Sequence, residues 1–559
     1  MTEVKRCLGG LPALVAILGA LMLSALLVNA VTLLLGHVFE NIDLRTHFRW
    51  AYQFSAALAE GVFYPRWMPL ANFGLGEPSF VIVHPGYYYV ISGFHALGLS
   101  IWDSIRAAAV GSTFFLGVVT YFVLRDTISA IWSFFGAVSV QASPFVSFLF
   151  GYHAALPWHF SIPIAVLAIS LSVRDRDRAL SISLVLAVAA LCLTHLLVAF
   201  MVLVCVGVMQ IVNIILTPLH LGLRIFSGWV GSVLLGVALA AVYVLLAATS
   251  GSLFSTENRI DEIYLNWRNS FIFPVVTSRI FGVRWGIVQW IMPIVPLTSV
   301  AITSFVLYRN RSERDLPWAV AARLTLLCVI GLLMASELVY PLYATVPFLT
   351  NVQWPYRFLT VASVAGGLAL PISGFIAFRT AGSLLSRALV VCCFALSLLL
   401  FVALQVKVAG EGVYPRLGLS TLTGNVAQKG AEPASIGPKW QSYLDGGGMQ
   451  GYCARNEMHC EPLLEQAHQR EWRVVVESDS RIVLPLFSFP AWTVSVDGQP
   501  SDSKIDNDTG LIELSLAAGT HEISVKWTGL WQERVGLFIT LATLFFIFWL
   551  VVIDRLKRI

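Results

Sequence analysis

The feature that most constrains this chain is a series of uncharged apolar runs, each about as long as a lipid bilayer is thick. A helix needs about 20 mostly apolar residues to cross the hydrocarbon core. The sequence contains such runs from its beginning to its end, and they predict twelve transmembrane helices. Their positions are 8–35, 107–124, 128–150, 154–173, 179–194, 196–218, 226–249, 286–308, 317–336, 358–378, 388–406 and 535–553.

Composition agrees with this class of protein. Hydrophobic residues make up 57% of the 559 residues and charged residues 12%, and the mean hydropathy is +0.76. These values exclude a soluble globular protein. The net charge of +4 is too small to indicate a nucleic-acid partner.

Two of the apolar runs are longer than a single crossing requires. The uncharged stretch 179–223 is too long for one crossing, and we divide it at His195. The first run, 8–35, follows Lys5 and Arg6 and is longer than the apolar core of a signal peptide. It therefore predicts a signal-anchor helix that is retained.

The positions of Lys and Arg predict the orientation of the helices. With the N-terminus in the cytoplasm, every strongly basic short connection falls on the cytoplasmic side. Treating 84–100 as another crossing would move Arg125 and the RDRDR run (174–178) outside, so we expect an interfacial helix there. The sequence thus predicts a multi-pass protein of the cytoplasmic membrane with both termini cytoplasmic.

The long polar segments then collect on the extracytoplasmic side, and the last of them predicts a separate domain. Alternating segments at 472–477, 481–487, 492–496, 511–516 and 521–527, separated by turn signals, are typical of strands. They predict a small β-sandwich, preceded by an irregular linker over 409–470. The expected organisation is a transmembrane domain (1–406) with an outer first loop (36–106), an extracytoplasmic linker and sandwich (407–534), and a final helix with a basic tail (535–559).

Cysteine placement supports an extracytoplasmic domain. Cys453 and Cys460 lie in the segment predicted to be outside. A disulfide is the favoured interpretation, because a metal site would need His or further Cys at suitable spacing.

The first outer loop concentrates ionisable and aromatic residues. It contains NIDLRTHFRW, GVFYPRWMPLANFGLGEPSF and VIVHPGYYYV. Such groups at a membrane surface cost free energy unless they bind or react with something. Asp43, a few residues beyond the first helix, is therefore the first candidate for chemistry. The alternative is that Asp43 only caps a helix beginning near Leu44.

These motifs resemble the GT-C superfamily of integral-membrane glycosyltransferases. The resemblance rests on an Asp after the first helix, G-x-x-Y-P-R-W, N-x-G-x-G, and H-P followed by aromatics. Residues 352–358 (VQWPYRF) resemble the family's Q-F-P-W-R-F motif with the aromatics changed at two positions. W-x-V-x-V-D-G and G-x-H-x-I-x-V in the sandwich also resemble the C-terminal part of related bacterial membrane glycosyltransferases. The pattern is most similar to bacterial and archaeal membrane proteins labelled 6-pyruvoyl-tetrahydropterin synthase-related, although no pterin chemistry is visible.

The resemblance implies sugar transfer from a polyprenyl-phosphate donor to a glycan, lipid or protein acceptor at the outer face. Asp43 would act as the catalytic base of an inverting transfer. Cationic side chains would bind the lipid phosphate that leaves. The substrate-binding residues that we expect are Arg66, His84, Arg357, Gln353, His47 and Tyr356.

Structural alternatives remain open for these residues. Arg66 could be an interfacial anchor, and Arg357 could extend from its helix end toward the headgroups. The first loop has no D-x-D motif, since Leu44 and Arg45 follow Asp43. We therefore expect no cofactor and leave a divalent metal open. The alternative functions are a non-catalytic scaffold or a transporter in cell-envelope polysaccharide assembly, although a transporter usually shows internal repeats, which we do not see.

Overall fold

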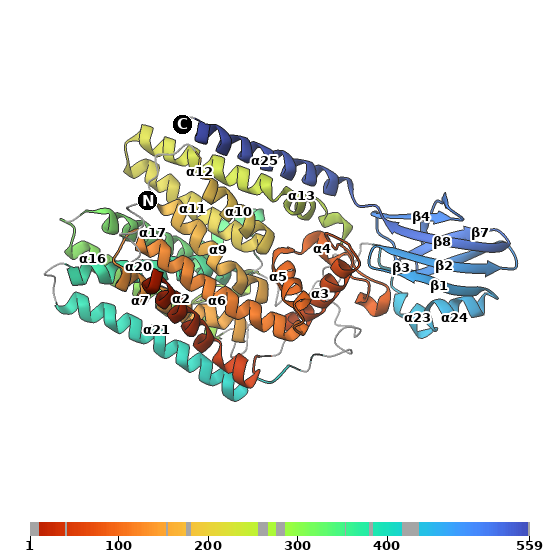
Figure 1. The fold of residues 1–559 in the computed structure, drawn as a ribbon, viewed down its shortest axis with the longest axis horizontal. Helices are drawn as coiled ribbons and strands as arrows, with labels where there is room; N and C mark the ends of the chain where they lie inside the picture. Colours follow the sequence, from red (N-terminus) through yellow and green to blue (C-terminus); the bar gives the residue numbers. More distant parts are fainter. Residues whose placement is uncertain are drawn as a thin grey trace. The chain divides into compact units, whose positions relative to one another are not determined.

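The fold is mostly helical, with β-sheets confined to the C-terminal part of the chain (Figure 1). The computed structural model describes residues 11–39, 42–152, 155–174, 180–254, 267–274, 286–312, 314–350, 352, 354–379, 384–415, 417 and 435–556. The chain divides into two compact units. We call them the helical unit (Met1–Leu44, Ile105–Val237 and Asp261–Arg416) and the mixed unit (Arg45–Ser104, Ala238–Ile260 and Leu417–Ile559).

The described residues contain eleven helices long and apolar enough to cross a membrane, and the chain is a multi-pass integral membrane protein. Ten of these spans lie wholly or mainly in the helical unit. They are α2 (Leu11–Val28), α6 (Ile101–Arg125), α7 with α8 and η3 (Ala130–Gly151), α9 (Leu156–Val173), α11 (Leu196–Leu216), α12 (Leu219–Leu239), η6 with α16 (Ile287–Arg309), α17 (Leu316–Ala335), η8 with α20 (Pro355–Arg379) and α21 (Leu384–Glu411). The eleventh is α25 (Trp531–Leu556), in the mixed unit.

The twelfth predicted span is a shorter helix, α10 (Ile182–Thr194). Its 13 residues cover about 20 Å, less than the hydrocarbon core. The predicted division at His195 is confirmed. This residue is extended (φ −161°, ψ 92°), and its Nδ1 accepts a hydrogen bond from the Val198 N–H, which caps α11.

The predicted span 226–249 is wrong at both ends. Helix α12 begins earlier, at Leu219 directly after Pro218, a residue well suited to a helix start. Ala240 then leaves helical geometry (φ −93°, ψ 9°) and separates α12 from α13 (Ala241–Thr249). One predicted crossing is thus a span followed by a short helix of the mixed unit.

Residues 84–100 do not form a crossing, as the basic loops predicted. Their helix, α5 (Gly86–Ala96), has 11 residues, too few to span a bilayer. The same loop contains α3 (Ile42–Ala59), the turn η2 (Ala71–Gly74) and α4 (Ser79–Ile82). The first loop is therefore a folded part of the molecule.

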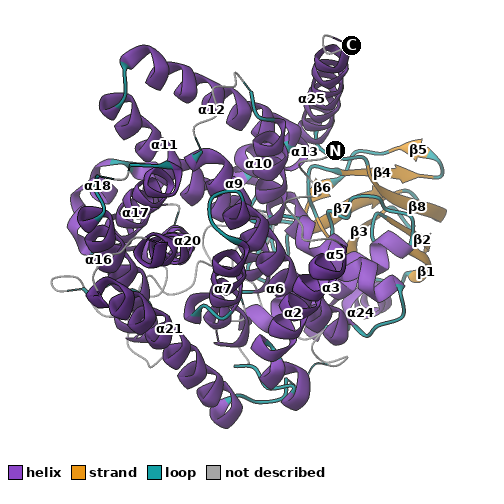
Figure 2. Ribbon diagram, turned by 60° about the vertical axis from the view of Figure 1, so that its left-hand side comes forward, coloured by secondary structure: helices purple, strands orange, loops and turns teal. Residues whose placement is uncertain are grey.

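All five predicted strands are present, and together with three additional strands they make a two-layer antiparallel sandwich (Figure 2). One sheet has the order β1-β2-β8-β4-β5 and the other β3-β7-β6. The predicted strands are β2 (Gln469–Val476), β3 (Ser480–Phe487), β4 (Trp492–Val496), β7 (Leu511–Leu516) and β8 (Gly519–Trp527). The additional strands are β1 (His459–Glu465), β5 (Gln499–Pro500) and β6 (Lys504–Ile505). Strand β2 buries alternate residues, as a half-buried strand should.

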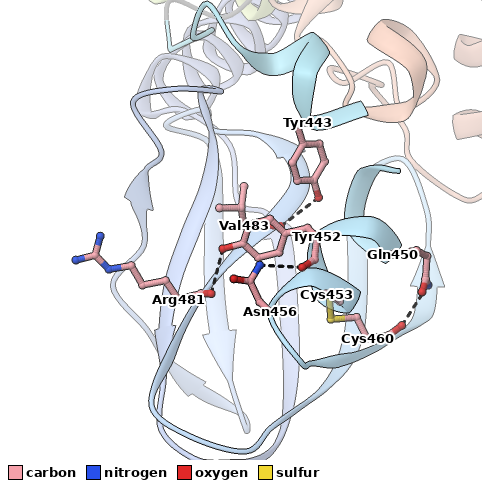
Figure 3. Close-up of a disulfide and its surroundings, with 8 residues drawn as sticks. All are labelled: Tyr443, Gln450, Tyr452, Cys453, Asn456, Cys460, Arg481 and Val483. Carbon is pink, nitrogen blue, oxygen red and sulfur yellow. Dashed lines mark hydrogen bonds between the residues drawn. A yellow bond between two sulfur atoms is a disulfide. The ribbon is translucent and has the colours of Figure 1, made fainter. Parts of the chain in front are cut away.

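The expectation of an irregular linker over 409–470 is wrong for its described C-terminal part. Besides β1, it forms α23 (Trp440–Asp445) and α24 (Gly448–Arg455). The predicted disulfide is present: Cys453 on α24 is bonded to Cys460 on β1, with Cα atoms 6.2 Å apart (Figure 3).

Hydrogen bonds fix these helices to the sandwich (Figure 3). Tyr443 donates its hydroxyl to the Val483 carbonyl (3.2 Å), and Tyr452 donates to the Arg481 carbonyl (3.1 Å). Both acceptors lie on β3. Short helices that sequence periodicity could not reveal are thus held by tertiary contacts.

The hydrophobic core of the sandwich includes residues from outside it. Trp67, Leu75 and Val81 of the first loop are fully buried in this core, together with Leu246 and Phe254. The backbone joins the same parts, because the Phe487 N–H donates to the Leu75 carbonyl (3.1 Å). The sandwich and the first loop therefore form one core, whereas the sequence indicated an independent domain.

Candidate active site

Asp43 lies in the first turn of α3, which begins at Ile42. It therefore does not occupy the capping position before the helix. A negative side chain is favoured there by the partial positive charge of the helix N-terminus. Its carboxylate interacts electrostatically with Arg357 and Tyr356, which are far away in the sequence. The predicted base thus lies within electrostatic range of two predicted ligands, and all three belong to the helical unit.

Arg357 is held between aromatic rings. Its guanidinium carbon lies 4.2 Å from the ring centroid of Trp354 and 5.7 Å from that of Trp158, both within cation–π range. One Nη1–H donates to the Val352 carbonyl (3.0 Å). These contacts fix the plane of the guanidinium, and a fixed plane favours binding of a phosphate by two parallel hydrogen bonds.

A layer of side chains and backbone supports this arrangement. Trp158 Nε1 on α9 donates to Thr360 Oγ1 (3.0 Å), and Thr360 Oγ1 donates to the Arg357 carbonyl (2.7 Å). The Tyr356 ring is stacked with Trp354 (6.0 Å between centroids, 13° between planes) and with Trp158 (6.4 Å, 26°). Helix α9 and the start of α20 therefore position Arg357 jointly.

Sequence reasoning missed two members of this site. Trp158 and Thr360 were not candidates, because a Trp near a helix end is typical of the aromatic belt and a Thr in a span is typical of helix packing. Trp354 was noted only as part of the VQWPYRF motif. Only the fold shows that Trp158 and Trp354 lie against one guanidinium.

His47 and His84 lie in the mixed unit. His47 is one turn after Asp43 on α3, and its Nδ1 is 2.7 Å from the Tyr88 hydroxyl. Burial, with a smaller contribution from His84, lowers the pKa of His47 to about 3, and burial lowers the pKa of His84 to about 4. At neutral pH both imidazoles are uncharged, so neither can neutralise a phosphate.

Arg66 is committed to structural contacts within the mixed unit. Its side chain is 3% exposed and its Nε lies 3.4 Å from Glu533 Oε2 on α25. Its Nη1 and Nη2 donate to the Phe80 and Val242 carbonyls (3.1 and 3.3 Å), and its guanidinium stacks on Tyr64 (3.3 Å). Arg66 thus joins the first loop to α13 and α25.

Gln353 lies outside the described residues. Within the part of the chain that the structure describes, no group of three or more His, Cys, Asp or Glu side chains could hold a metal ion.

Two hollows lie in the helical unit near the candidate site. The first is a small cavity between α7, α16 and α20, lined by apolar residues and five serines, and both Phe145 and Ile162 contribute to its wall. Phe145 contacts Trp158, with 6.0 Å between ring centroids. The second is an apolar groove of about 350 Å³ between α7 and α21. Ser139 and Ser397 line both, so cavity and groove adjoin.

No family model and no curated protein matches the chain. Among solved structures, the chain is similar to the cryo-EM structure of the arabinofuranosyltransferase AftD from Mycobacteria, at 13% sequence identity and a TM-score of 0.43. The match covers 92% of this chain and 40% of that one. A likeness at this level carries no argument about activity, which must rest on the site.

Proposed function

We propose that this protein is a membrane glycosyltransferase of the GT-C type. In this proposal it transfers a sugar from a polyprenyl-phosphate donor to a glycan, lipid or protein acceptor at the extracytoplasmic face. The observation that carries the proposal is the electrostatic interaction of Asp43 with Arg357 and Tyr356, which belong to two of the motifs through which the chain resembles that superfamily.

The chemistry assigns one role to each group. The acceptor oxygen forms a bond to the anomeric carbon while the bond from that carbon to the lipid phosphate oxygen breaks. Asp43 takes the proton of the acceptor hydroxyl, and Arg357 binds the departing phosphate. Because the displacement is direct, the configuration of the anomeric carbon inverts. The donor supplies the leaving group, so no further reactant is required.

Aromatic surfaces and the adjoining hollows suit the remaining parts of such a donor. Trp354 and Trp158 flank Arg357, where they can also exclude water and strengthen the charge interactions. The apolar groove between α7 and α21 offers space for a hydrocarbon chain. Phe145 lines the first cavity and contacts Trp158, which flanks Arg357. The cavity therefore lies beside the position proposed for the phosphate.

The other predicted ligands take revised roles in this proposal. Arg66 acts by positioning the first loop, since its guanidinium is engaged by Glu533 and by backbone carbonyls. His47 and His84 act as neutral hydrogen-bonding groups. Arg357 then supplies the positive charge that binds the phosphate.

The decisive experiment replaces the base and the cation separately in the purified full-length protein. Asp43→Asn preserves the size of the side chain and removes the base, so we expect transfer to be lost and donor binding to be nearly unchanged. Arg357→Ala should weaken donor binding by at least tenfold, because a charge-assisted hydrogen bond contributes about 1.5–3 kcal/mol. Asp502→Asn, at an exposed position in the sandwich, is the matched control.

The same variants separate the enzyme from a scaffold. The measurements are transfer of a labelled sugar and equilibrium binding of a polyprenyl-phosphate analogue. Wild-type transfer that persists in Asp43→Asn would exclude Asp43 as the base. If neither the wild type nor any variant shows transfer, and Asp43→Asn supports envelope assembly as well as the wild type does, the protein is a scaffold.

A further inference from the structure

A polar cavity, separate from the two hollows described above, lies at the opposite end of α9 from Trp158. It has a volume of about 40 Å³ and is partly open. It is lined by the C-terminal end of α9, the start of α10, and α11 and α12, all of the helical unit. On α9, Ser172 of this cavity is 14 residues after Trp158 of the candidate active site, a separation of about 21 Å along the helix. The two sites are therefore distinct.

Small residues on α12 create the space for this cavity. Gly228 and Ser232 are one turn apart, are buried, and line it. On either side the helices approach closely, since a Cβ on Gly236 would lie 2.7 Å from the Cβ of Val188 on α10, and one on Gly222 would lie 2.8 Å from Ile214 on α11. The cavity is thus enclosed by tight helix packing, as small residues at spacings of four permit.

The groups that line the cavity are mainly hydrogen-bond donors. Trp229 Nε1 is buried and makes no hydrogen bond to any described residue. The Ser181 hydroxyl accepts from the Leu184 N–H (3.4 Å), which leaves its own proton available. Gln210 donates one Nε2–H to the Ser172 carbonyl (2.8 Å), and a second remains. An unsatisfied buried donor destabilises the folded protein, so a ligand oxygen that accepts from it would be stabilising.

The charge of the lining residues also favours an anionic ligand. Arg174 lines the cavity, and its side chain is 15% exposed. It pairs with Asp126 through Nη1 (2.6 Å) and donates Nη2 to the Val123 carbonyl (2.5 Å). Asp126 does not line the cavity, and among the described residues no carboxylate does. The site therefore presents a cation and several donors to one small volume.

We propose that this cavity binds a phosphate oxyanion, carried by an anionic lipid headgroup or free in solution. Trp229 Nε1, Ser181 and Gln210 donate to the oxygens, and Arg174 supplies the positive charge. The open side lets the remainder of a lipid leave the cavity. The basic connections predict this end of the helices to be cytoplasmic, where anionic headgroups and cytosolic phosphate are both present.

Trp229→Phe tests the assignment, because it keeps an aromatic ring at this position and removes the N–H donor. The experiment uses native mass spectrometry of the full chain in detergent. The lipid probes are phosphatidylglycerol and diacylglycerol, which share glycerol and acyl chains but differ in the phosphate. We expect retention of phosphatidylglycerol over diacylglycerol, and about a tenfold loss of that retention in Trp229→Phe. Trp549→Phe, at an exposed position on α25, should behave as wild type.

A parallel titration with inorganic phosphate separates the two sources. If phosphate binds, Trp229→Phe weakens it, and phosphatidylglycerol is not retained, then the ligand is free phosphate. Equal retention or binding in wild type and Trp229→Phe for both probes would overturn the proposal. An equal loss in Trp549→Phe would also overturn it, because the effect would then not belong to this cavity.

Discussion

At the scale of single residues, two arginines that look alike in the sequence have different surroundings. Arg66 and Arg357 each adjoin an aromatic residue, in PRW and PYRF, and both were predicted to bind phosphate. Arg66 is paired with Glu533 and bonded to two carbonyls, whereas Arg357 lies between Trp354 and Trp158 and interacts with Asp43. Residue type did not separate the two, because the difference lies in partners from distant parts of the chain.

Arg357→Lys should weaken donor binding although it keeps the charge. A lysine ammonium has no plane to lie between the two indoles and cannot bind a phosphate bidentately. We expect at least a fivefold loss of affinity for a polyprenyl-phosphate analogue, since the lost hydrogen bond alone contributes about 1 kcal/mol or more. Arg387→Lys serves as control. In the wild type, the Arg387 Nε–H donates to the Ala377 carbonyl. Unchanged affinity in Arg357→Lys would show that charge alone is recognised.

The buried histidines predict loss of stability in acid. The pKa values of His47 and His84 are about 3 and 4 in the folded protein, below the usual 6.5 of an unfolded chain. The unfolded state therefore binds more protons below pH 6.5, and stability falls as the pH decreases from there toward 4. The loss should reach about 1–2 kcal/mol per histidine at pH 5.

Melting temperatures in detergent at pH 7 and pH 5 measure this effect. His47→Gln and His84→Gln should each reduce the difference between the two values. His521→Gln should increase it, because the Asp497 carboxylate raises the pKa of His521 and so makes that residue stabilising in acid. The same difference in all three variants would contradict the assignment.

At the scale of elements, the turn after Trp67 is the most constrained part of the first loop. Asn72 and Phe73 have positive φ (50° and 58°), and so do Gly74 and Gly76. The turn is fixed from the sandwich by Arg470, which donates to the carbonyls of Pro69 and Gly74 (3.1 and 3.0 Å). A turn of this kind persists because its surroundings determine it.

The two glycines of this turn predict different effects of one added methyl group. A Cβ at Gly76 (φ +83°) would lie 2.1 Å from Nε1 of the fully buried Trp67, whereas one at Gly74 (φ +96°) would meet nothing within 4 Å. Gly74→Ala should lower the free energy of unfolding by about 1–2 kcal/mol through backbone strain alone. Gly76→Ala should lower it further, because a steric clash with Trp67 adds to the same strain. Thermal unfolding in detergent should rank wild type above Gly74→Ala and Gly74→Ala above Gly76→Ala. Equal melting temperatures for the two variants would show that Trp67 moves freely.

At the scale of the whole molecule, the basic connections predict which side of the membrane each segment occupies. The N-terminus, the C-terminus and the connection after α16 should be cytoplasmic, and the sandwich extracytoplasmic. The exposed residues Ser503, between β5 and β6, and Ser312, after α16, are suitable reporters. A membrane-impermeant thiol reagent applied to intact cells should label Ser503→Cys, and Ser312→Cys only after the membrane is breached. The reverse pattern would invert the topology.

The sequence by itself determined the class of fold and most of the element positions. Long uncharged runs must form helices in a membrane, because backbone polar groups have no other partner there, and alternating runs must expose one face of a sheet. His195 also divided two helices as expected, since its side chain caps the second. These features follow from local pattern and solvent, so they can be predicted without tertiary contacts.

Only the tertiary structure decided which parts of the chain act together. It closed the core of the sandwich with Trp67, ordered α23 and α24 against β3, and left Arg66 to pair with Glu533. It also brought Asp43 within electrostatic range of Arg357 and placed Trp158 against the Arg357 guanidinium. These outcomes depend on contacts between residues far apart in the chain. Such contacts have no period in the sequence, because packing geometry selects each partner.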